Sequence, residues 1–431
     1  MNILESLYAG AVTALHPALP LLARGEGKLA RGIRGRRGVV ERMEAWARAE
    51  RDPARPLAWF HAPSVGEGLQ ARAVVEAFRE RMPDAQVAYT YFSPSAERFG
   101  ATVPADFADY LPFDAPGDVR RALQALRPGV IAFSKYDVWP VLTREAKARG
   151  TRLALLSATL PSSSGRLSGL ARMLLAPAYA RLDAVAAISA NDAERFGRLG
   201  VPAARRTVMG DARFDQVWAR AASVDDASPL LAPLLNFEGL TVVAGSTWGH
   251  DEERLLPAFA AARELVGDVR LVLVPHEPTP AHLHAAEARL RALGLRHTRL
   301  ADVLDGATVQ EVLVVDRVGV LGELYAVADV AYVGGGYGTA GLHSVLEPAA
   351  FGTPVLFGPR HANAREAAEL LAAGAATEAA DEPALRDALL HLLSDPAARA
   401  RRGAAARAYV QSGTGAAERG ADVVEDLLGR V

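Results

Sequence analysis

The chain of 431 residues contains no cysteine. This absence excludes disulfide bonds, cysteine-ligated metals and a thiol nucleophile, and it fits a reducing compartment. The net charge of −2 at pH 7 is close to neutral, so the chain as a whole has no nucleic-acid-binding signature. Half of the residues are hydrophobic and 23% are charged, which is ordinary globular composition with ample material for a core.

Several functional motifs are also missing. No GxGxxG turn is followed by a ribose-binding acid, and there is no Walker loop, so dinucleotide binding and NTP hydrolysis are disfavoured. The ten histidines show no spacing that fixes a zinc site. His282 and His284 lie two residues apart, but on the helix predicted there they face different directions. We therefore expect no metal and no cofactor.

The N-terminus combines an apolar stretch with a basic one. Residues 6–23 carry no Asp, Glu, Lys or Arg, whereas residues 24–37 hold six basic residues against one acid, Glu26. No basic segment precedes the apolar stretch, so it is a poor secretory signal, and Pro17 and Pro20 interrupt a stretch barely long enough to span a bilayer. We interpret residues 1–37 as an interfacial anchor whose basic flank faces anionic head groups. A helix packed on its own domain is the alternative.

From residue 57 onward, short apolar runs alternate with amphipathic stretches, which predicts an α/β fold with parallel sheets and crossover helices. The predicted strands are Leu57–His61, Gln86–Tyr91, Gly129–Phe133, Arg152–Ser157, Ala184–Ser189, Leu240–Ala244, Val269–Pro275, Val312–Val315, Val330–Val333 and Pro354–Phe357. The predicted helices include Gly68–Met82, Pro116–Leu126, Trp139–Arg149, Ser168–Ala180, Ala190–Leu199, Glu252–Val266, Pro280–Leu293, Gly322–Val327, Val345–Phe351, Ala364–Ala373, Glu382–Leu392 and Pro396–Ser412.

The strands fall into two series, which predicts two Rossmann-like domains. We place the first domain at residues 38–221, a link at 222–238, where turn formers and two prolines gather, and the second domain at 239–431. The last helix is a candidate for packing back on the first domain. Doubly wound sheets bind ligands at the carboxyl ends of their strands, so we expect an open cleft between two lobes.

The most informative stretch runs from Gly334 to Val355 (GGGYGTAGLHSVLEPAAFGTPV). Glycines after the apolar strand Val330–Val333 let backbone approach a phosphate, and the next helix start offers free N–H groups to an anion. Glu347 is expected in the first turn of that helix, where a carboxylate can reach sugar hydroxyls. Nucleotide-sugar transferases with two Rossmann-like halves use this layout to hold a donor. A glycine-rich turn that binds nothing is the alternative.

Glu67 lies in His61-Ala62-Pro63-Ser64-Val65-Gly66-Glu67-Gly68, which follows the first strand and opens a helix. A carboxylate at this place can act as a general base that removes the proton of an acceptor hydroxyl. Ser64 and Glu67 also have the S-x-x-E spacing of a capping box, so Glu67 can instead cap its own helix. The spacing alone leaves both roles open, and one residue could fill both.

Other polar residues follow predicted strands. Gly245 and Ser246 can offer N–H groups and a hydroxyl to a phosphate, or form a plain turn. His276 is a plausible phosphate or base contact, although a lone histidine is more often structural. Lys135 and Asp137 can bind an anionic sugar or orient the base, or form a solvated pair. Arg213 can reach a phosphate, or pair with an aspartate beside it, Asp211 or Asp215.

Taken together, these segments resemble the 3-deoxy-D-manno-octulosonic acid (Kdo) transferases of lipopolysaccharide assembly. The ordered combination of H-A-x-S-V-G-E, L-P-F-D and G-x-x-H-x-x-L-E-P-A carries the resemblance, which extends over residues 57–376 and also includes the N-terminal apolar and basic stretches. It implies a GT-B type glycosyltransferase fold, with two Rossmann-like domains facing a central cleft, and inverting chemistry without a metal.

By position, Glu67 corresponds to the family's general base, which deprotonates a sugar hydroxyl of the lipid acceptor. Ser64, Lys135, Asp137 and Arg213 are expected to position the acceptor or balance charge. The residues expected on the donor side are Gly245, Ser246, His276, Gly319, Gly335, Gly336, His343, Ser344 and Glu347. The resemblance thus implies CMP-Kdo as donor, a lipid A precursor as acceptor, an anionic membrane surface bound through residues 1–37 and no nucleic acid.

Some positions depart from the commonest family pattern. Lys135-Tyr136-Asp137 stands where many members have Glu-Thr-Glu, and Pro275-His276-Glu277-Pro278 where Pro-Arg-His-Pro is usual. Ser344 replaces an Asn, Arg213 a Lys, and Val320 a Glu. These departures concern the donor contacts and the choice of sugar.

The sequence thus predicts a Kdo transferase associated with the cytoplasmic face of the bacterial inner membrane. One alternative is another GT-B type enzyme, such as a UDP-sugar 2-epimerase, which would need no lipid acceptor. The other is a non-catalytic, membrane-bound sugar-nucleotide sensor, which would bind CMP or CMP-Kdo without turnover.

Overall fold

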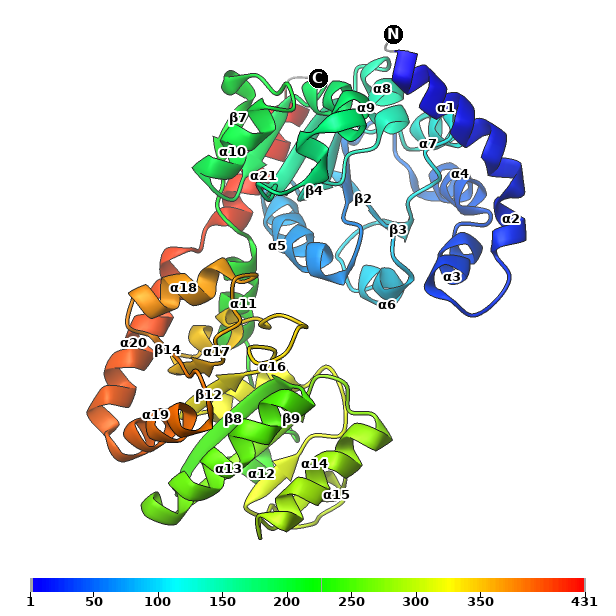
Figure 1. Cartoon of the computed structure of the whole chain (residues 1–431). Coiled ribbons are helices and arrows are strands. Elements are labelled where there is room, and N and C mark those ends of the chain that lie inside the picture. The colour runs from blue at the N-terminus through cyan, green and yellow to red at the C-terminus, as the bar shows by residue number, and fades with distance from the viewer. Residues whose placement is uncertain (1–2, 226, 430–431) are drawn as a thin grey trace. The chain divides into compact units, whose positions relative to one another are not determined.

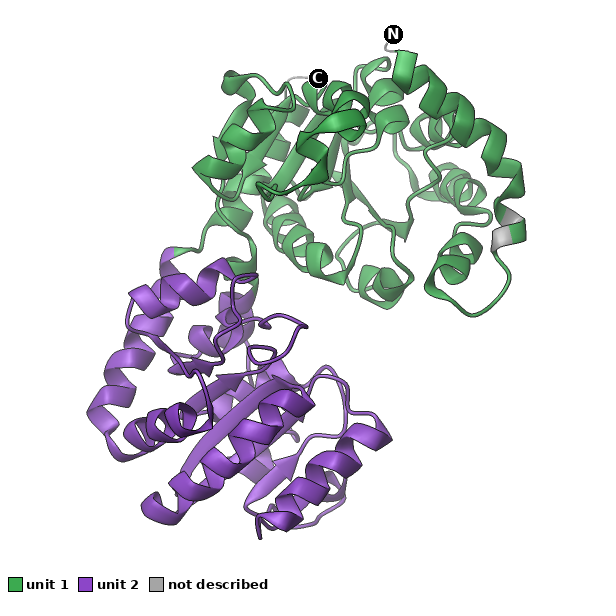
Figure 2. Ribbon diagram, in the orientation of Figure 1, with its two compact units in different colours: residues 1–216, 413–431 green, residues 217–412 purple. Residues whose placement is uncertain are grey.

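The computed structural model describes residues 3–225 and 227–429, which form two compact units (Figures 1 and 2). Unit 1 comprises Met1–Gln216 together with Gly413–Val431, and unit 2 comprises Val217–Ser412. Each unit is built around its own parallel sheet of seven strands. The predicted α/β class with two Rossmann-like sheets is therefore confirmed.

The elements of unit 1 are α1 (Ile3–Leu15), η1 (His16–Ala18), α2 (Leu19–Leu22), α3 (Lys28–Gly35), α4 (Val39–Glu50), β1 (Leu57–His61), α5 (Val65–Arg81), β2 (Gln86–Tyr91), η2 (Pro94–Ala96), α6 (Glu97–Gly100), β3 (Phe107–Tyr110), α7 (Pro116–Leu126), β4 (Val130–Ser134), α8 (Pro140–Lys147), β5 (Arg152–Ala158), η3 (Gly165–Leu167), α9 (Gly169–Ala180), β6 (Ala184–Ala187), α10 (Ala190–Gly197), η4 (Ala203–Arg205), β7 (Arg206–Val208) and α21 (Ala416–Leu428). Helix α11 (Arg213–Ala222) leads from unit 1 into unit 2.

The elements of unit 2 are α12 (Ala232–Leu235), β8 (Leu240–Thr247), α13 (Gly249–Val266), β9 (Val269–Pro275), α14 (Pro280–Ala292), β10 (His297–Arg299), α15 (Leu300–Leu304), β11 (Val312–Val314), α16 (Leu321–Leu324), η5 (Tyr325–Val327), β12 (Val330–Val333), α17 (Leu346–Ala350), β13 (Val355–Phe357), α18 (Arg365–Ala372), β14 (Ala376–Glu378), α19 (Glu382–Ser394) and α20 (Pro396–Ser412).

The strand order places a topological switch point in each sheet. Unit 1 has the order β3-β2-β1-β4-β5-β6-β7, so that β1 pairs with β4, and unit 2 has the order β10-β11-β9-β8-β12-β13-β14, so that β8 pairs with β12. Central strands such as β1 and β9 are buried along their whole length, because helices cover both faces of a parallel sheet. The carboxyl ends of the switch-point strands are where open α/β sheets bind ligands.

The predicted link at residues 222–238 belongs to unit 2 rather than running free. It contains α12, and the side chains of Leu231 and Leu234 are buried in the core of that unit with Val243 and Val272. Prolines and turn formers suggest a link in the sequence, but three leucines close together supply enough apolar surface to hold the stretch on the sheet.

The last helix, α21, belongs to unit 1. It packs against α5 and buries Ala421 and Val424 in the core of that unit. Asp215 accepts hydrogen bonds from the backbone N–H groups of Gly415 (2.5 Å) and Ala417 (3.0 Å), which fixes the start of the helix.

Helices α1 to α3 lie along one side of unit 1 (Figure 1). Helix α1 is held there by its buried Glu5, whose carboxylate pairs with Arg181 at 2.5 and 2.7 Å. The other face of α1 leaves Ile3 and Leu7 exposed. The N-terminal stretch therefore packs partly on its own domain and also presents apolar side chains outward.

Candidate functional site

Glu67 and Lys135 flank the switch point of unit 1. Glu67 lies in the first turn of α5, after β1, and Lys135 follows β4. The Lys135 ammonium lies 2.9 Å from Glu67 Oε1, and the Ser64 hydroxyl donates a hydrogen bond to Glu67 Oε2. The structure thus brings three of the predicted residues together at the carboxyl end of the sheet.

The capping box suggested by the S-x-x-E spacing does not form. Ser64 is the N-cap residue of α5, but its side chain accepts no hydrogen bond from the helix backbone. The hydroxyl instead points to the Glu67 carboxylate. Both carboxylate oxygens are therefore engaged by side chains, and the carboxylate also accepts a hydrogen bond from its own backbone N–H in the first turn of α5.

The environment of Glu67 keeps its carboxyl ionised. Burial alone would raise its pKa, but the hydrogen bond from Ser64 and the ion pair with Lys135 outweigh burial and lower the pKa below its ordinary value. Burial raises the pKa of the Tyr89 phenol on β2, and the nearby Tyr91 and the charge of the Glu67 carboxylate raise it further.

Lys135 is held in a strained conformation. Its φ of +66° is unusual for a residue with a side chain, and the neighbouring strand fixes it through Lys135 N to Leu156 O (2.8 Å) and Thr159 N to Lys135 O (3.2 Å). Ser246, at the end of β8 in unit 2, also has a positive φ, of +53°. Such strain persists where the surroundings enforce it and is often found at functional sites.

The remaining predicted residues of unit 1 lie in other pairs. Asp137 accepts hydrogen bonds from Trp139 Nε1 (3.1 Å) and interacts with His61 Nε2 (3.1 Å). Arg213 pairs with the neighbouring Asp211, at 2.7 Å between Nη2 and Oδ2. Of the alternatives left open for Arg213, the structure therefore shows the pair with Asp211.

The switch point of unit 2 borders a pocket of about 310 Å³. Its lining includes five residues predicted for the donor side, namely Ser246, Gly319, His343, Ser344 and Glu347. The rest of the lining is Arg220, Leu321, Gly322, Tyr325 and Val333. The pocket therefore combines a cation, a carboxylate, two serine hydroxyls, a tyrosine phenol and an imidazole, a set suited to a ligand that carries both an anion and hydroxyl groups.

Glu347 and Arg220 give this pocket its charges. Glu347 lies in the first turn of α17. Burial raises the pKa of its carboxyl above the ordinary value, and the positive charge of Arg220 offsets only part of this rise. No described residue forms a hydrogen bond with the Glu347 carboxylate, which leaves its oxygens available for ligand hydroxyls. Arg220 was not among the predicted residues, because α11 gives no sequence signal of contact with β8 or β12.

Three glycines of this site lie where neighbouring segments of the chain leave no room for a side chain. A Cβ on Gly336 would lie 2.6 Å from Gly358 N, and one on Gly245 would lie 2.1 Å from Tyr325 Oη. A Cβ on Gly335 would lie 2.1 Å from Gly341 O. These three glycines therefore allow segments of the protein to pack closely, and their expected approach to a phosphate stays a prediction.

His276 stacks on His343, with ring centroids 4.2 Å apart, and both rings lie beside Trp248, which is tilted against His276 and stacked with His343. Trp248 was not predicted as a site residue. Trp248 follows β8, and the sequence does not show that its segment meets those of His276 and His343.

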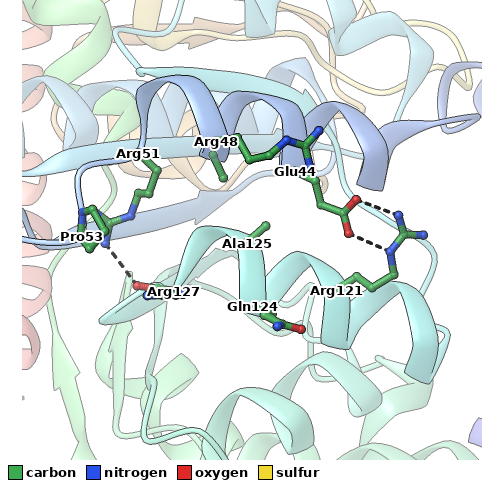
Figure 3. Close-up of a pocket in the computed structure, with 9 residues that line it drawn as sticks. Glu44, Arg48, Arg51, Pro53, Arg121, Gln124, Ala125 and Arg127 are labelled. Carbon is green, nitrogen blue, oxygen red and sulfur yellow. Dashed lines mark hydrogen bonds and ion pairs between the residues drawn. The ribbon is translucent and has the colours of Figure 1, made fainter.

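Another pocket, of about 380 Å³, lies between α4 and α7 of unit 1 (Figure 3). Arg121 forms an ion pair with both carboxylate oxygens of Glu44, at 2.8 and 2.9 Å. Arg51 donates to the backbone carbonyls of Leu126 (2.9 Å) and Arg127 (3.4 Å). Because these arginines join the two helices on the side of the amino ends of β1 and β4, we interpret this pocket as a structural contact between α4 and α7 and not as a ligand site.

Two parallel doubly wound sheets with polar residues at both switch points define a GT-B type glycosyltransferase fold. Solved structures share this fold. The UDP-GlcNAc 2-epimerase of Neisseria meningitidis has a TM-score of 0.60 at 11% identity, covering 88% of this chain and all of that one. A glycosyltransferase of Rickettsia africae has a TM-score of 0.58 at 10% identity over the same shares.

Sequence comparison identifies the family. Residues 33–216 match the family model described as 3-deoxy-D-manno-octulosonic-acid transferase. The 3-deoxy-D-manno-octulosonic acid transferase of Bordetella pertussis is 34% identical over 89% of this chain and 90% of its own, and that of Haemophilus influenzae is 25% identical over 92% and 93%. The chain belongs to the Kdo transferase family and is a glycosyltransferase.

Proposed function

We propose that this enzyme transfers Kdo from CMP-Kdo to the lipid A precursor lipid IVA, with inversion at the anomeric carbon and with Glu67 as general base. The observation that carries the proposal is the Glu67 carboxylate, held by Ser64 and Lys135 at the carboxyl end of β1 and kept ionised there. Family membership supports the sugar and the donor, and the pocket of unit 2 supplies groups suited to a sugar nucleotide.

The proposed transfer requires one general base and one leaving group. The acceptor hydroxyl attacks the anomeric carbon of Kdo while its proton passes to the Glu67 carboxylate. The bond between that carbon and the phosphate oxygen of CMP breaks, and CMP leaves with the electron pair. Since CMP is a fair leaving group, the protein need only position it, balance its charge and activate the acceptor.

The direct test is transfer by the purified protein. CMP-Kdo is generated in situ, tetraacylated lipid IVA serves as acceptor, and mass spectrometry reads the product. A mass gain of one or more Kdo units supports the proposal and counts the sugars added. Folded protein that binds CMP but adds no mass would instead favour a different donor sugar or the non-catalytic sensor.

The Lys135 charge is expected to set the acid limit of activity. Lys135→Met removes the ammonium beside Glu67 and so raises the pKa of the carboxyl. Because the ionised carboxylate is the base, the acid limb of kcat/KM against pH should move to higher pH. Lys135→Arg keeps the charge and should leave the limb in place. Lys147→Met, which removes a lysine paired with Asp183 in the same unit, is the control. An unmoved limb in Lys135→Met would contradict this role.

We also propose that the N-terminal helices attach the enzyme to the cytoplasmic face of the inner membrane. Exposed apolar side chains are spread over α1 to α3, namely Ile3, Leu7, Leu15, Leu21 and Leu29. Exposed cations lie close to them in the chain, namely Arg24, Lys28, Arg31 and Arg37. Among the described residues no helix is both long and apolar enough to cross a bilayer. Apolar insertion and attraction to anionic lipid act together in such surfaces.

Vesicle flotation tests this attachment. Wild-type protein should bind vesicles containing phosphatidylglycerol better than neutral ones. Leu7→Asp should weaken binding roughly tenfold or more, because it removes one inserted leucine and adds a like charge. Leu265→Asp on α13 of unit 2 is the matched control, since Leu265 is 71% exposed and Leu7 63%. Equal loss in both variants, or no loss in Leu7→Asp, would contradict the assignment of this surface.

A further inference from the structure

Trp248 and His343 form a hydrogen bond that determines the tautomer of the histidine. The indole Nε1 of Trp248 lies 3.0 Å from His343 Nε2. An indole nitrogen can only donate, so His343 Nε2 must accept and cannot carry a proton. A neutral imidazole whose Nε2 is bare carries its proton on Nδ1.

Both partners of this hydrogen bond are anchored. Trp248 precedes α13, and its backbone N–H donates to Asp251 Oδ2 at 2.9 Å. The same buried carboxylate accepts from Gly335 N (2.9 Å) and Tyr332 Oη (2.8 Å), and the His343 backbone N–H donates to Gly334 O at 3.1 Å. Asp251 therefore ties the start of α13 to the glycine loop, which fixes the indole relative to the imidazole.

His343 stays neutral at physiological pH. Burial and the adjacent His276 lower its pKa to about 4. A proton on Nε2 would also occupy the lone pair that accepts the hydrogen bond from Trp248, and two N–H groups would then face each other. This contact therefore favours the neutral imidazole as well. His343 is therefore a neutral hydrogen-bond donor through Nδ1, and the positive charge of the pocket comes from Arg220.

The Nδ1–H group has no protein acceptor among the described residues, and His343 lines the pocket that contains Arg220, Ser246 and Glu347. We propose that Trp248 is a positioning residue that holds His343 as the Nδ1–H tautomer, so that His343 donates a hydrogen bond to a phosphate oxygen of the sugar nucleotide. This inference rests on the proposed function, since it takes the pocket of unit 2 as the site of the CMP-sugar.

The first test observes the tautomer without turnover. In ¹⁵N-histidine-labelled protein near pH 7, His343 should show a protonated Nδ1 and a bare Nε2. Trp248→Phe keeps an aromatic ring and removes the donor, so it should move His343 toward the Nε2–H form. Trp218→Phe in α11 is the matched control, because Trp218 contacts Arg407 and should leave the His343 signals unchanged. A wild-type His343 protonated on Nε2 would overturn the proposal.

The second test measures CMP binding by calorimetry. Trp248→Phe should weaken binding about tenfold, the usual scale for one hydrogen bond to a charged acceptor. If Trp248 acts through His343, the same substitution should cost little more once His343→Gln is present. Unchanged affinity in Trp248→Phe, or fully additive losses, would overturn the positioning role. Wild-type protein that neither binds CMP nor transfers Kdo would refute the proposed function and the choice of ligand. The comparison of the His343 tautomer in wild type and Trp248→Phe would still decide whether Trp248 controls His343.

Discussion

Glu67→Gln is expected to reduce Kdo transfer by about 10²- to 10⁴-fold, the usual contribution of a general base. The amide has nearly the shape of the carboxylate and can still accept a hydrogen bond, but it cannot take the proton of the acceptor hydroxyl. Because Glu67 does not line the nucleotide pocket, CMP affinity should not change. Rates by mass spectrometry and CMP binding by calorimetry measure the two properties separately.

Glu76→Gln on the same helix is the matched control. Glu76 forms an exposed i,i+4 pair with Arg72 at 2.7 Å, and such pairs contribute little to stability. Its variant should therefore retain transfer. Equal thermal stability of the two variants would show that the loss in Glu67→Gln is chemical. A fully active Glu67→Gln enzyme would reduce Glu67 to a helix residue whose charge is balanced by Lys135.

The strands that the sequence predicts are the ones buried on both faces. All ten predicted strands exist, with bounds shifted by a few residues. The four that were missed, β3, β7, β10 and β14, are the outermost strands of the two sheets. Strand β10 is only half-buried and β7 is largely exposed, so neither produces the continuous apolar run by which a central strand is recognised.

The site divides in the same way between what local sequence shows and what it cannot show. Glu67, His343 and Glu347 follow strands within recognisable motifs, so their neighbourhood could be predicted. Arg220 and Trp248 could not, because a lone arginine on a helix and a lone tryptophan after a strand carry no motif. Their roles depend on contacts with residues far along the chain; Trp248, for example, meets His343 across a sequence separation of 95 positions.

The residue spacing around Glu67 predicts a helix cap, whereas in the structure Lys135 pairs with this carboxylate. Ser64 and Glu67 have the sequence of a capping box, but Lys135 supplies a cation that competes for the Glu67 carboxylate. A charged partner at 2.9 Å forms a stronger hydrogen bond than a neutral backbone N–H, so the side chain turns toward it. Local motifs therefore set which interactions are possible, and the tertiary partners decide among them.

Gly335→Ala is expected to abolish CMP binding and to destabilise unit 2 by about 3 kcal/mol or more, in the range of strained backbone positions with an added clash. Gly335 has a φ of +94°, and an added Cβ would lie 2.1 Å from the carbonyl oxygen of Gly341 and 3.3 Å from His343 Cδ2. To relieve this overlap the loop must move, which breaks the hydrogen bond from Gly335 N to Asp251 and displaces His343 from the pocket.

Gly374→Ala separates the clash from the backbone strain. Gly374 also has a positive φ, of +68°, but an added Cβ would meet nothing within 4 Å. This variant should therefore cost only about 1–2 kcal/mol, the usual penalty of a left-handed conformation for alanine, and should bind CMP normally. Thermal unfolding should show the larger drop in Gly335→Ala, at about 2–4 °C per kcal/mol for a domain of this size. Equal behaviour of the two variants would mean that the loop relaxes without cost, and that the contact between Gly335 and Gly341 does not hold His343 in place.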